Sequence, residues 1–201
     1  MSRLLIASNN RGKRIEIQAL FEELEIELIM PHDIGLDLSV VEDGHTYEEN
    51  AAKKAHAFAD ASGLLTLADD SGLEVDALNG APGLFSARYS NKPGASDADR
   101  RHYLLKQLRD KPKPWIARFR CVIAIATVDG SIVFSEGICP GEIISEERGI
   151  NGFGYDPIFL LPELGLTMAE LEMSVKNQYS HRARAVRAAI PKLTVLIEGS
   201  N

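Results

Sequence analysis

The feature that most constrains the fold is a pair of long apolar segments, residues 116–128 and 131–139, that meet at Asp129-Gly130. An Asp-Gly pair between two such runs is a strong hairpin signal, because glycine adopts the positive φ that a tight turn requires. The sequence therefore predicts two long strands joined by a hairpin.

The other segments alternate between strand-like and helix-like patterns. We predict strands at 3–8, 26–30 and 64–68, helices at 12–24, 46–61 and 97–109, and a last helical stretch at 181–197 that is interrupted at Pro191. Helices interleaved with strands and one long hairpin predict an α/β fold with a mixed sheet. No repeat, low-complexity tract or linker divides the chain, so we expect residues 1–201 to form a single domain.

Composition limits the classes of function. The chain has 201 residues, a net charge of −7 and a pI near 5.3, which argues against a nucleic-acid polymer or an anionic membrane as partner. No apolar run approaches the roughly 20 residues that cross a bilayer, and no signal-peptide pattern is present, so we expect a cytoplasmic protein. Cys121 and Cys139 make neither a CxxC motif nor a disulfide framework, and we expect both to be reduced.

The first apolar run gives way to the polar turn Ser8-Asn9-Asn10-Arg11-Gly12-Lys13. Helical spacing places Lys13 at the head of the apolar stripe that continues through Ile17 and Phe21. A lysine at a helix start opposes the helix dipole, so the arrangement favours a phosphate held by Lys13, Ser8, Asn10 and backbone N–H groups. The alternative is a polar turn with an N-cap, from which Lys13 extends into water.

A second lysine, Lys54, projects from the apolar face of the next predicted helix. It is a second candidate for binding phosphate, although a packed stem with its ammonium in water fits equally well. Thr46 and Glu49 fit a capping box, which explains Glu49 at least as well as catalysis does. Glu42 precedes this helix in a stretch where acidic residues commonly form turns.

Paired carboxylates follow the predicted strand at 64–68, in Asp69-Asp70-Ser71-Gly72. The carboxyl ends of strands are where open α/β sheets bind ligands. One acid can bind a hard cation while the other accepts a proton from water or holds it. The alternative is an Asp-Ser-Gly turn with solvated carboxylates.

Later segments carry groups that suit a nucleotide. Arg88 follows a glycine-rich stretch and could bind phosphate, and Phe153 and Tyr155 lie between glycines in Gly152–Pro157 with Asp156 beside them. Stacking on a base and a turn with core aromatic residues both remain open for this segment. Ser180 has the pattern of an N-cap and is followed by the basic pair His181-Arg182, with Lys176 just upstream.

Six motifs, in order along nearly the whole chain, resemble one family: SNNRGK, ENAAKKA, ADDSGL, GAPGLFSARYS, GFGYDPIF and SHRARA. The set is similar to the pyrophosphatases of aberrant purine nucleoside triphosphates, called inosine triphosphatases or Ham1-like proteins. The usual first motif is Ser or Thr, one residue, Asn, two residues and Lys, and Ser8, Asn10 and Lys13 fill it.

The resemblance implies an α/β fold with a long central mixed β-sheet flanked by helices and two lobes with a nucleotide-binding cleft between them. It implies a homodimer and Mg²⁺-dependent hydrolysis of XTP, ITP and dITP to the monophosphate and pyrophosphate, which removes deaminated purines before they enter DNA or RNA. Asp70 would be the proton acceptor and would hold the metal with Glu42, and Asp69 would be its alternate partner.

The resemblance also assigns the substrate-binding residues. The triphosphate would be bound by Ser8, Asn9, Asn10, Arg11, Gly12, Lys13 and Lys54, with Ser71 and Arg88 near it, and the base by Phe153, Gly154, Tyr155, Asp156, Lys176, His181 and Arg182. Donors from His181, Arg182 or Lys176 would favour a 6-oxo purine over adenine. We further hypothesise that the shape of the pocket excludes the 2-amino group of guanine.

Two alternatives remain at this stage. A Maf-like nucleotide pyrophosphatase has a related fold and chemistry, but GFGYDP and SHR argue against it. A nucleotide sensor without catalytic activity would not need the pair Asp69-Asp70.

Overall fold

The computed structural model describes residues 2–22 and 24–199. The strands are β1 (Ser2–Ile6), β2 (Ile26–Ile29), β3 (Thr66–Val75), β4 (Trp115–Ala126), β5 (Ile132–Ile143), β6 (Phe159–Leu161) and β7 (Leu166–Thr167). The α-helices are α1 (Arg11–Phe21), α2 (Tyr47–Ser62), α3 (Asp97–Leu108), α4 (Met173–Tyr179) and α5 (His181–Gly199). Within these ranges no helix combines the length and the hydropathy that crossing a membrane requires.

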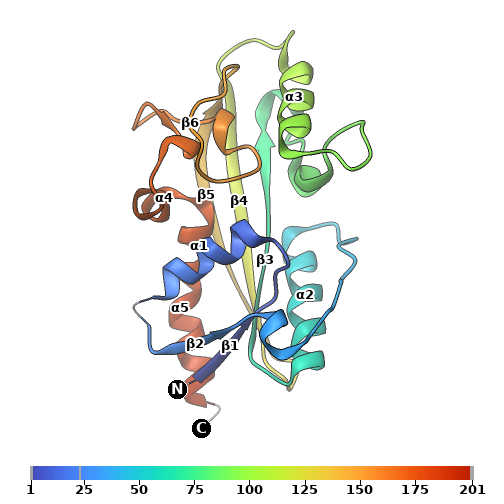
Figure 1. The fold of residues 1–201 in the computed structure, drawn as a ribbon, viewed down its shortest axis with the longest axis vertical. Helices are drawn as coiled ribbons and strands as arrows, with labels where there is room; N and C mark the ends of the chain where they lie inside the picture. The colour runs from blue at the N-terminus through green and yellow to red at the C-terminus, as the bar shows by residue number, and fades with distance from the viewer. Residues whose placement is uncertain (1, 23, 200–201) are drawn as a thin grey trace. The chain divides into compact units, whose positions relative to one another are not determined.

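The strands of the described residues form a seven-stranded sheet in the order β2-β1-β3-β4-β5-β6-β7 (Figure 1). Strand β1 is parallel to both β2 and β3, whereas β6 is antiparallel to β5 and β7. The α/β fold with a mixed sheet flanked by helices is therefore confirmed. The predicted hairpin is confirmed too, since β4 and β5 are joined by a turn in which Thr127 N donates to Ser131 O at 2.9 Å.

The chain divides into two compact units. Unit 1 takes residues 1–70, 121–137 and 181–201, and unit 2 takes 71–120 and 138–180. Strands β3, β4 and β5 each contribute residues to both units.

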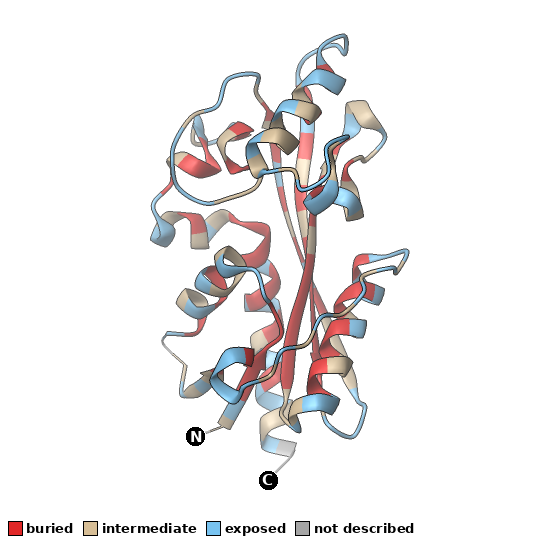
Figure 2. Cartoon of the chain, turned by 45° about the vertical axis from the view of Figure 1, so that its right-hand side comes forward, coloured by how far each residue is buried: buried red, intermediate tan, exposed pale blue. Residues whose placement is uncertain are grey.

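In unit 1, different helices cover the two faces of the sheet. One core contains alternate residues of β1 and β4 together with residues of α1 and α5: Leu4, Ile6, Cys121, Ile123, Ile125, Ile17, Phe21, Ala185, Val186 and Ala189. Helix α2 covers the opposite face (Figure 1). The intervening strand residues Leu5, Val122 and Ala124 are also buried. Because successive side chains of a strand point to opposite faces, both faces of the unit 1 sheet are covered, and Figure 2 shows its long strands mostly in the buried colour.

Unit 2 has its own apolar core. It is formed by α3, by the unit 2 ends of β3, β4 and β5, and by β6, and it includes Leu73, Leu104, Leu108, Trp115, Phe119 and Phe159. The rings of Phe119 and Phe159 pack with their centroids 4.4 Å apart.

Most predicted boundaries differ from the structure by one to three residues, and three predictions are wrong in larger ways. Strand β3 does not end at residue 68 but continues to Val75, because the partners of Asp69 and Asp70 allow both carboxylates to be buried in mid-strand. Helix α5 continues through Pro191, where neighbouring residues such as Ala189 and Leu193 are buried against the sheet. Strand β5 extends to Ile143 rather than ending at residue 139.

Candidate active site

The turn between β1 and α1 provides the N-cap of α1, which is Asn10. Asn10 Oδ1 accepts from Lys13 N at 3.0 Å, and Ser8 Oγ accepts from Asn10 N at 3.3 Å. The Lys13 side chain is only 16% exposed, and its Nζ lies 3.0 Å from Asp69 Oδ2. The alternative to a phosphate site was a polar turn with an N-cap and a solvated Lys13. The N-cap is present, but Lys13 does not extend into water.

The position of Asp69 and Asp70 inside β3 separates their carboxylates. Successive side chains of a strand point to opposite faces of the sheet. Asp69 lies in line with Leu67, which packs in the core shared with α1 and α5. Asp70 points to the α2 side, where it accepts from Asn50 Nδ2 at 3.1 Å. One strand thus presents two adjacent acids to two different sets of partners.

Asp69 is held by cations on a single oxygen. Its Oδ2 lies 3.0 Å from Lys13 Nζ and 3.3 Å from Arg182 Nε, and the thiol of Cys121 lies 4.0 Å away. Burial alone would raise the pKa of Asp69, but Lys13 and Arg182 hold that pKa well below its usual range. Asp69 is therefore ionised at neutral pH and is a poor proton acceptor.

The same burial keeps Cys121 neutral. Loss of water and the nearby Asp69 carboxylate raise the pKa of the Cys121 thiol to about 12. Cys121 and Cys139 are both buried, and neither is in a disulfide within the described part of the chain.

Asp70 has the opposite electrostatic balance. The residue is 6% exposed, and its burial raises its pKa more than Lys54 and Lys13 lower it, with a further increase from Glu42. A carboxylate whose pKa is raised takes up a proton more readily near neutral pH. Of the two acids, Asp70 is the better candidate for a general base.

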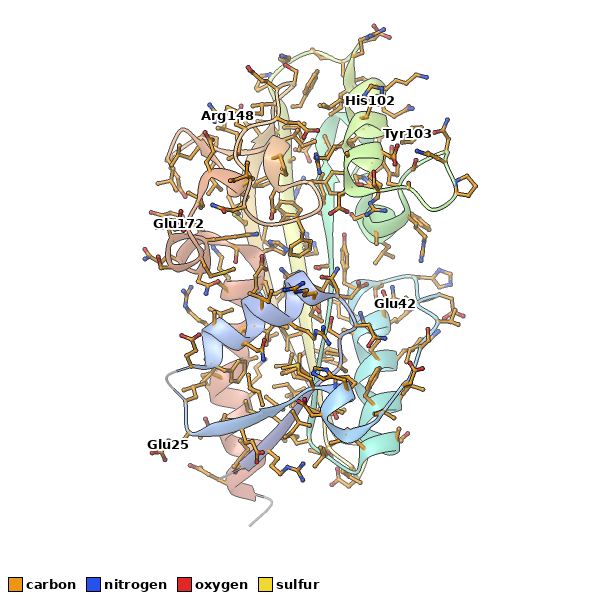
Figure 3. All side chains as sticks on the ribbon, viewed as in Figure 1. Glu25, Glu42, His102, Tyr103, Arg148 and Glu172 are labelled. Carbon is orange, nitrogen blue, oxygen red and sulfur yellow. The ribbon has the colours of Figure 1, made fainter. Side chains whose placement is uncertain are left out.

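Lys54 joins these acids to Glu42. Its Nζ donates to the backbone oxygen of Asp69 at 2.6 Å and lies 2.8 Å from Glu42 Oε1. Burial would lower the pKa of Lys54, but the carboxylates of Asp69 and Glu42 raise it, so the ammonium stays charged. Glu42 lies on the segment that leads into α2 and is the most accessible of this group (Figure 3).

Glu42 and Asp70 suit a magnesium ion bound together with a substrate. Their carboxylates interact electrostatically and offer the hard oxygen ligands that Mg²⁺ prefers. Among residues 2–22 and 24–199 there is no group of three or more His, Cys, Asp or Glu side chains that could form a complete protein cage. Mg²⁺ is commonly held by one or two carboxylates, with phosphate oxygens and water completing its shell.

The start of α5 adds a buried ion pair. Arg182 is 2% exposed, and its Nη1 pairs with the carboxylate of Glu16 on α1. Gly137 allows β5 to approach this helix turn, since a Cβ there would lie 2.2 Å from the backbone oxygen of His181. The structure thus places Arg182 against carboxylates, and its contact with a base stays a prediction. Glu16 was not predicted as a site residue, although its place one turn after Lys13 on a buried stripe indicates the need for a cation.

A second polar group lies within unit 2. Lys176 Nζ is 2.6 Å from Asp156 Oδ2 and 5.4 Å from the centre of the Phe153 ring. The same Asp156 oxygen accepts from Phe153 N at 2.9 Å. Gly152 has φ +74°, and a Cβ there would lie 2.0 Å from that oxygen, so only glycine fits.

Other predicted residues have their own partners. The Tyr155 hydroxyl donates to Ser86 O at 2.9 Å, and Gly154 N donates to Asp97 Oδ2 at 2.8 Å. Arg88 is exposed, with its guanidinium 5.0 Å over the Phe85 ring. The remaining predicted residues range from exposed to buried: Asn9 and Arg11 are exposed, Gly12 and Ser71 are half-buried, and His181 is buried. Their predicted contacts with substrate stay predictions.

The comparisons with known proteins agree on one family. The model of the Ham1 family matches residues 4–192. The chain is 46% identical to the dITP/XTP pyrophosphatase of Desulforamulus reducens, with 96% of each chain covered, and 43% identical to that of Listeria monocytogenes, with 98% of each covered. The solved HAM1 protein of Coxiella burnetii is 41% identical with a TM-score of 0.85, and the alignment covers 98% of this chain and 100% of that one. This similarity extends over nearly the full length of sequence and structure, and the chain therefore belongs to the Ham1 family.

Proposed function

We propose that this chain hydrolyses deaminated purine nucleoside triphosphates, XTP, ITP and dITP, to the nucleoside monophosphate and pyrophosphate. One observation carries the proposal: the ammonium groups of Lys13, which is half-buried, and of Lys54, which is buried, lie beside Asp69, next to the carboxylate pair of Asp70 and Glu42. Relatives that are 43% to 46% identical carry the name dITP/XTP pyrophosphatase, which supports the same activity. Neither a Maf-like enzyme nor a sensor receives such support.

Each group of unit 1 has a role in this proposal. Lys13 and Lys54 bind the triphosphate, whose charge of about −4 explains why an acidic protein gathers cations locally. Asp70 accepts the proton of the attacking water, and the bond to the leaving pyrophosphate breaks as the new P–O bond forms. Glu42 and Asp70 would hold Mg²⁺, which supplies charge neutralisation on the phosphates. Asp69 orients Lys13 through its carboxylate and Lys54 through its backbone oxygen.

In this proposal, hydrogen-bond donors and an aromatic ring recognise the base. Phe153 offers a face for stacking, and Lys176 and His181 offer donors to a 6-oxo group, which adenine lacks. The Lys176 ammonium is fixed by Asp156, so its position does not depend on the ligand. Exclusion of guanine by the shape of the pocket stays a hypothesis.

The proposal is tested by pyrophosphate release from ITP, XTP, dITP, ATP and GTP, each with and without Mg²⁺. We expect rapid, metal-dependent release from the first three and little from ATP. Binding of ITP without cleavage would instead identify a sensor. Equal turnover of GTP and ITP would refute the shape hypothesis for guanine. The homodimer and the cytoplasmic location stay predictions, which size-exclusion chromatography with light scattering and cell fractionation can check.

Replacing Lys54 with methionine should weaken binding of a non-hydrolysable ITP analogue by about tenfold or more, since a charged hydrogen bond contributes about 1.5–3 kcal/mol. Lys53→Met is the matched control, because Lys53 directly precedes Lys54 and pairs with the exposed Asp43. Isothermal titration calorimetry measures both variants. Equal affinities of the two variants would show that Lys54 does not contact the triphosphate.

A further inference from the structure

Asn50 bonds one of the two carboxylates that would hold the metal and the backbone of the segment that carries the other. It is in the first turn of α2 and is 1% exposed. Its Nδ2 donates to Asp70 Oδ2 at 3.1 Å, and its Oδ1 accepts from the backbone N–H of Gly44 at 2.8 Å. Gly44 is two residues after Glu42 in the segment that carries that carboxylate. A single buried amide therefore connects Asp70 to the segment of Glu42.

We infer that Asn50 is a positioning residue that sets Asp70 and Glu42 at the separation required by the metal and the attacking water. The inference rests on the proposed function, because it concerns the same site. A side chain in this place must accept from a backbone N–H and donate to an ionised carboxylate. An amide meets both requirements, whereas aspartate lacks the donor and aliphatic side chains lack both groups.

The environment of Gly44 indicates that the link is closely fitted. A Cβ on Gly44 would lie 2.7 Å from Asn50 Oδ1 and 2.8 Å from Glu49 Cβ. Neither contact can be relieved cheaply, because the amide is buried and Glu49 is held in the first turn of α2. An added methyl group at residue 44 would therefore displace the Asn50 amide or the segment of Glu42. The connection between Asp70 and the segment of Glu42 can thus be broken by a substitution at Asn50 or at Gly44.

Helix capping does not account for the two side-chain bonds of Asn50. The start of α2 is capped by Thr46 Oγ1, which accepts from Glu49 N at 3.1 Å, while Glu49 Oε2 accepts from His45 N at 2.7 Å. Of the two bonds of the predicted capping box, the one from Glu49 N to Thr46 Oγ1 forms. The Glu49 carboxylate accepts from His45 N instead of Thr46 N. Removing the Thr46 cap should weaken the same helix turn and leave the Asn50 amide in place, which makes Thr46→Ala a matched control.

The test compares Asn50→Ala, Gly44→Ala, their double variant and Thr46→Ala. Three quantities are measured: kcat for ITP, Mn²⁺ affinity by electron paramagnetic resonance with a non-hydrolysable ITP analogue, and the melting temperature. We expect Asn50→Ala and Gly44→Ala each to lower kcat or Mn²⁺ affinity by about 10- to 100-fold, as is typical when a group that orients metal ligands is lost. The double variant should be no worse than Asn50→Ala, because both changes break one link. Thr46→Ala should lower only the melting temperature.

Two results would overturn the inference. The first is a fall in melting temperature for Asn50→Ala and Gly44→Ala with kcat and Mn²⁺ affinity unchanged, which would make Asn50 a purely structural residue. The second is a double variant whose loss is the sum of the single losses, which would show that the two residues act separately. Failure of the proposed function is distinguishable, since the wild-type protein would then release no pyrophosphate, while the Mn²⁺ measurement would still report on Asn50.

Discussion

Replacing Asp70 with asparagine should lower pyrophosphate release from ITP by about 10³-fold, which is within the range for losing a general base. Asparagine keeps the size of the side chain but cannot take a proton from water, and it weakens any bond to a cation. Because the pKa of Asp70 is raised while that of Asp69 is lowered, we predict that Asp70, rather than Asp69, accepts the proton. Single-turnover kinetics at saturating Mg²⁺ measure the chemical step directly.

Asp43→Asn is the control for this experiment, because Asp43 is an exposed acid in the segment that also carries Glu42. We expect it to retain activity within about twofold, as is usual for surface substitutions. The Asp70→Asn variant should still bind the ITP analogue, since Lys13 and Lys54 are intact. Turnover by Asp70→Asn within tenfold of wild type would contradict the assignment of Asp70 as the base.

The sequence was sufficient to predict those helices and strands that have a strong local pattern of apolar and turn residues. The hairpin at Asp129-Gly130 and the alternation of helices with strands predicted the mixed sheet, and the helix that begins after Asn10 was predicted within about one residue at its start. The candidate residues Lys13, Lys54, Glu42, Asp69 and Asp70 do lie together in unit 1. The spacing of residues on a helix face and their position at the end of an apolar strand are local signals, and they pointed to these residues.

What the sequence could not supply is which partner each charge meets. Asp69-Asp70-Ser71-Gly72 has the composition of a turn, and only contacts from distant segments make it part of a strand. Lys13 and Arg182 are 169 positions apart in the numbering, yet both reach Asp69 Oδ2. Asn50 likewise has no local signal that distinguishes it from any polar residue in a first helical turn. Helical periodicity can indicate that a charge such as Glu16 is buried, but it does not identify the distant residue that pairs with it.

Replacing Arg182 with methionine should lower the free energy of unfolding by about 3–5 kcal/mol, which is typical of removing one member of a buried ion pair. Methionine fills much of the same space, but it removes the guanidinium that pairs with the buried Glu16 carboxylate and takes one cation from Asp69. Urea denaturation followed by circular dichroism measures the loss. The prediction separates two roles of Arg182, because a residue that only contacts the base would affect the KM for ITP and leave stability intact.

Arg184→Met is the matched control, since Arg184 is exposed on the same helix and its loss should cost no more than about 0.5 kcal/mol. Adding Glu16→Gln to Arg182→Met should recover part of the lost stability, because it removes a buried charge that no longer has its guanidinium. If Arg182→Met unfolds within 0.5 kcal/mol of wild type, roughly the effect of a surface change, the ion pair contributes little and Arg182 is held for the substrate. Recovery by Glu16→Gln would instead show that the Glu16 carboxylate depends on the guanidinium of Arg182, so that this buried pair joins α1 to a helix that begins more than a hundred residues later in the chain.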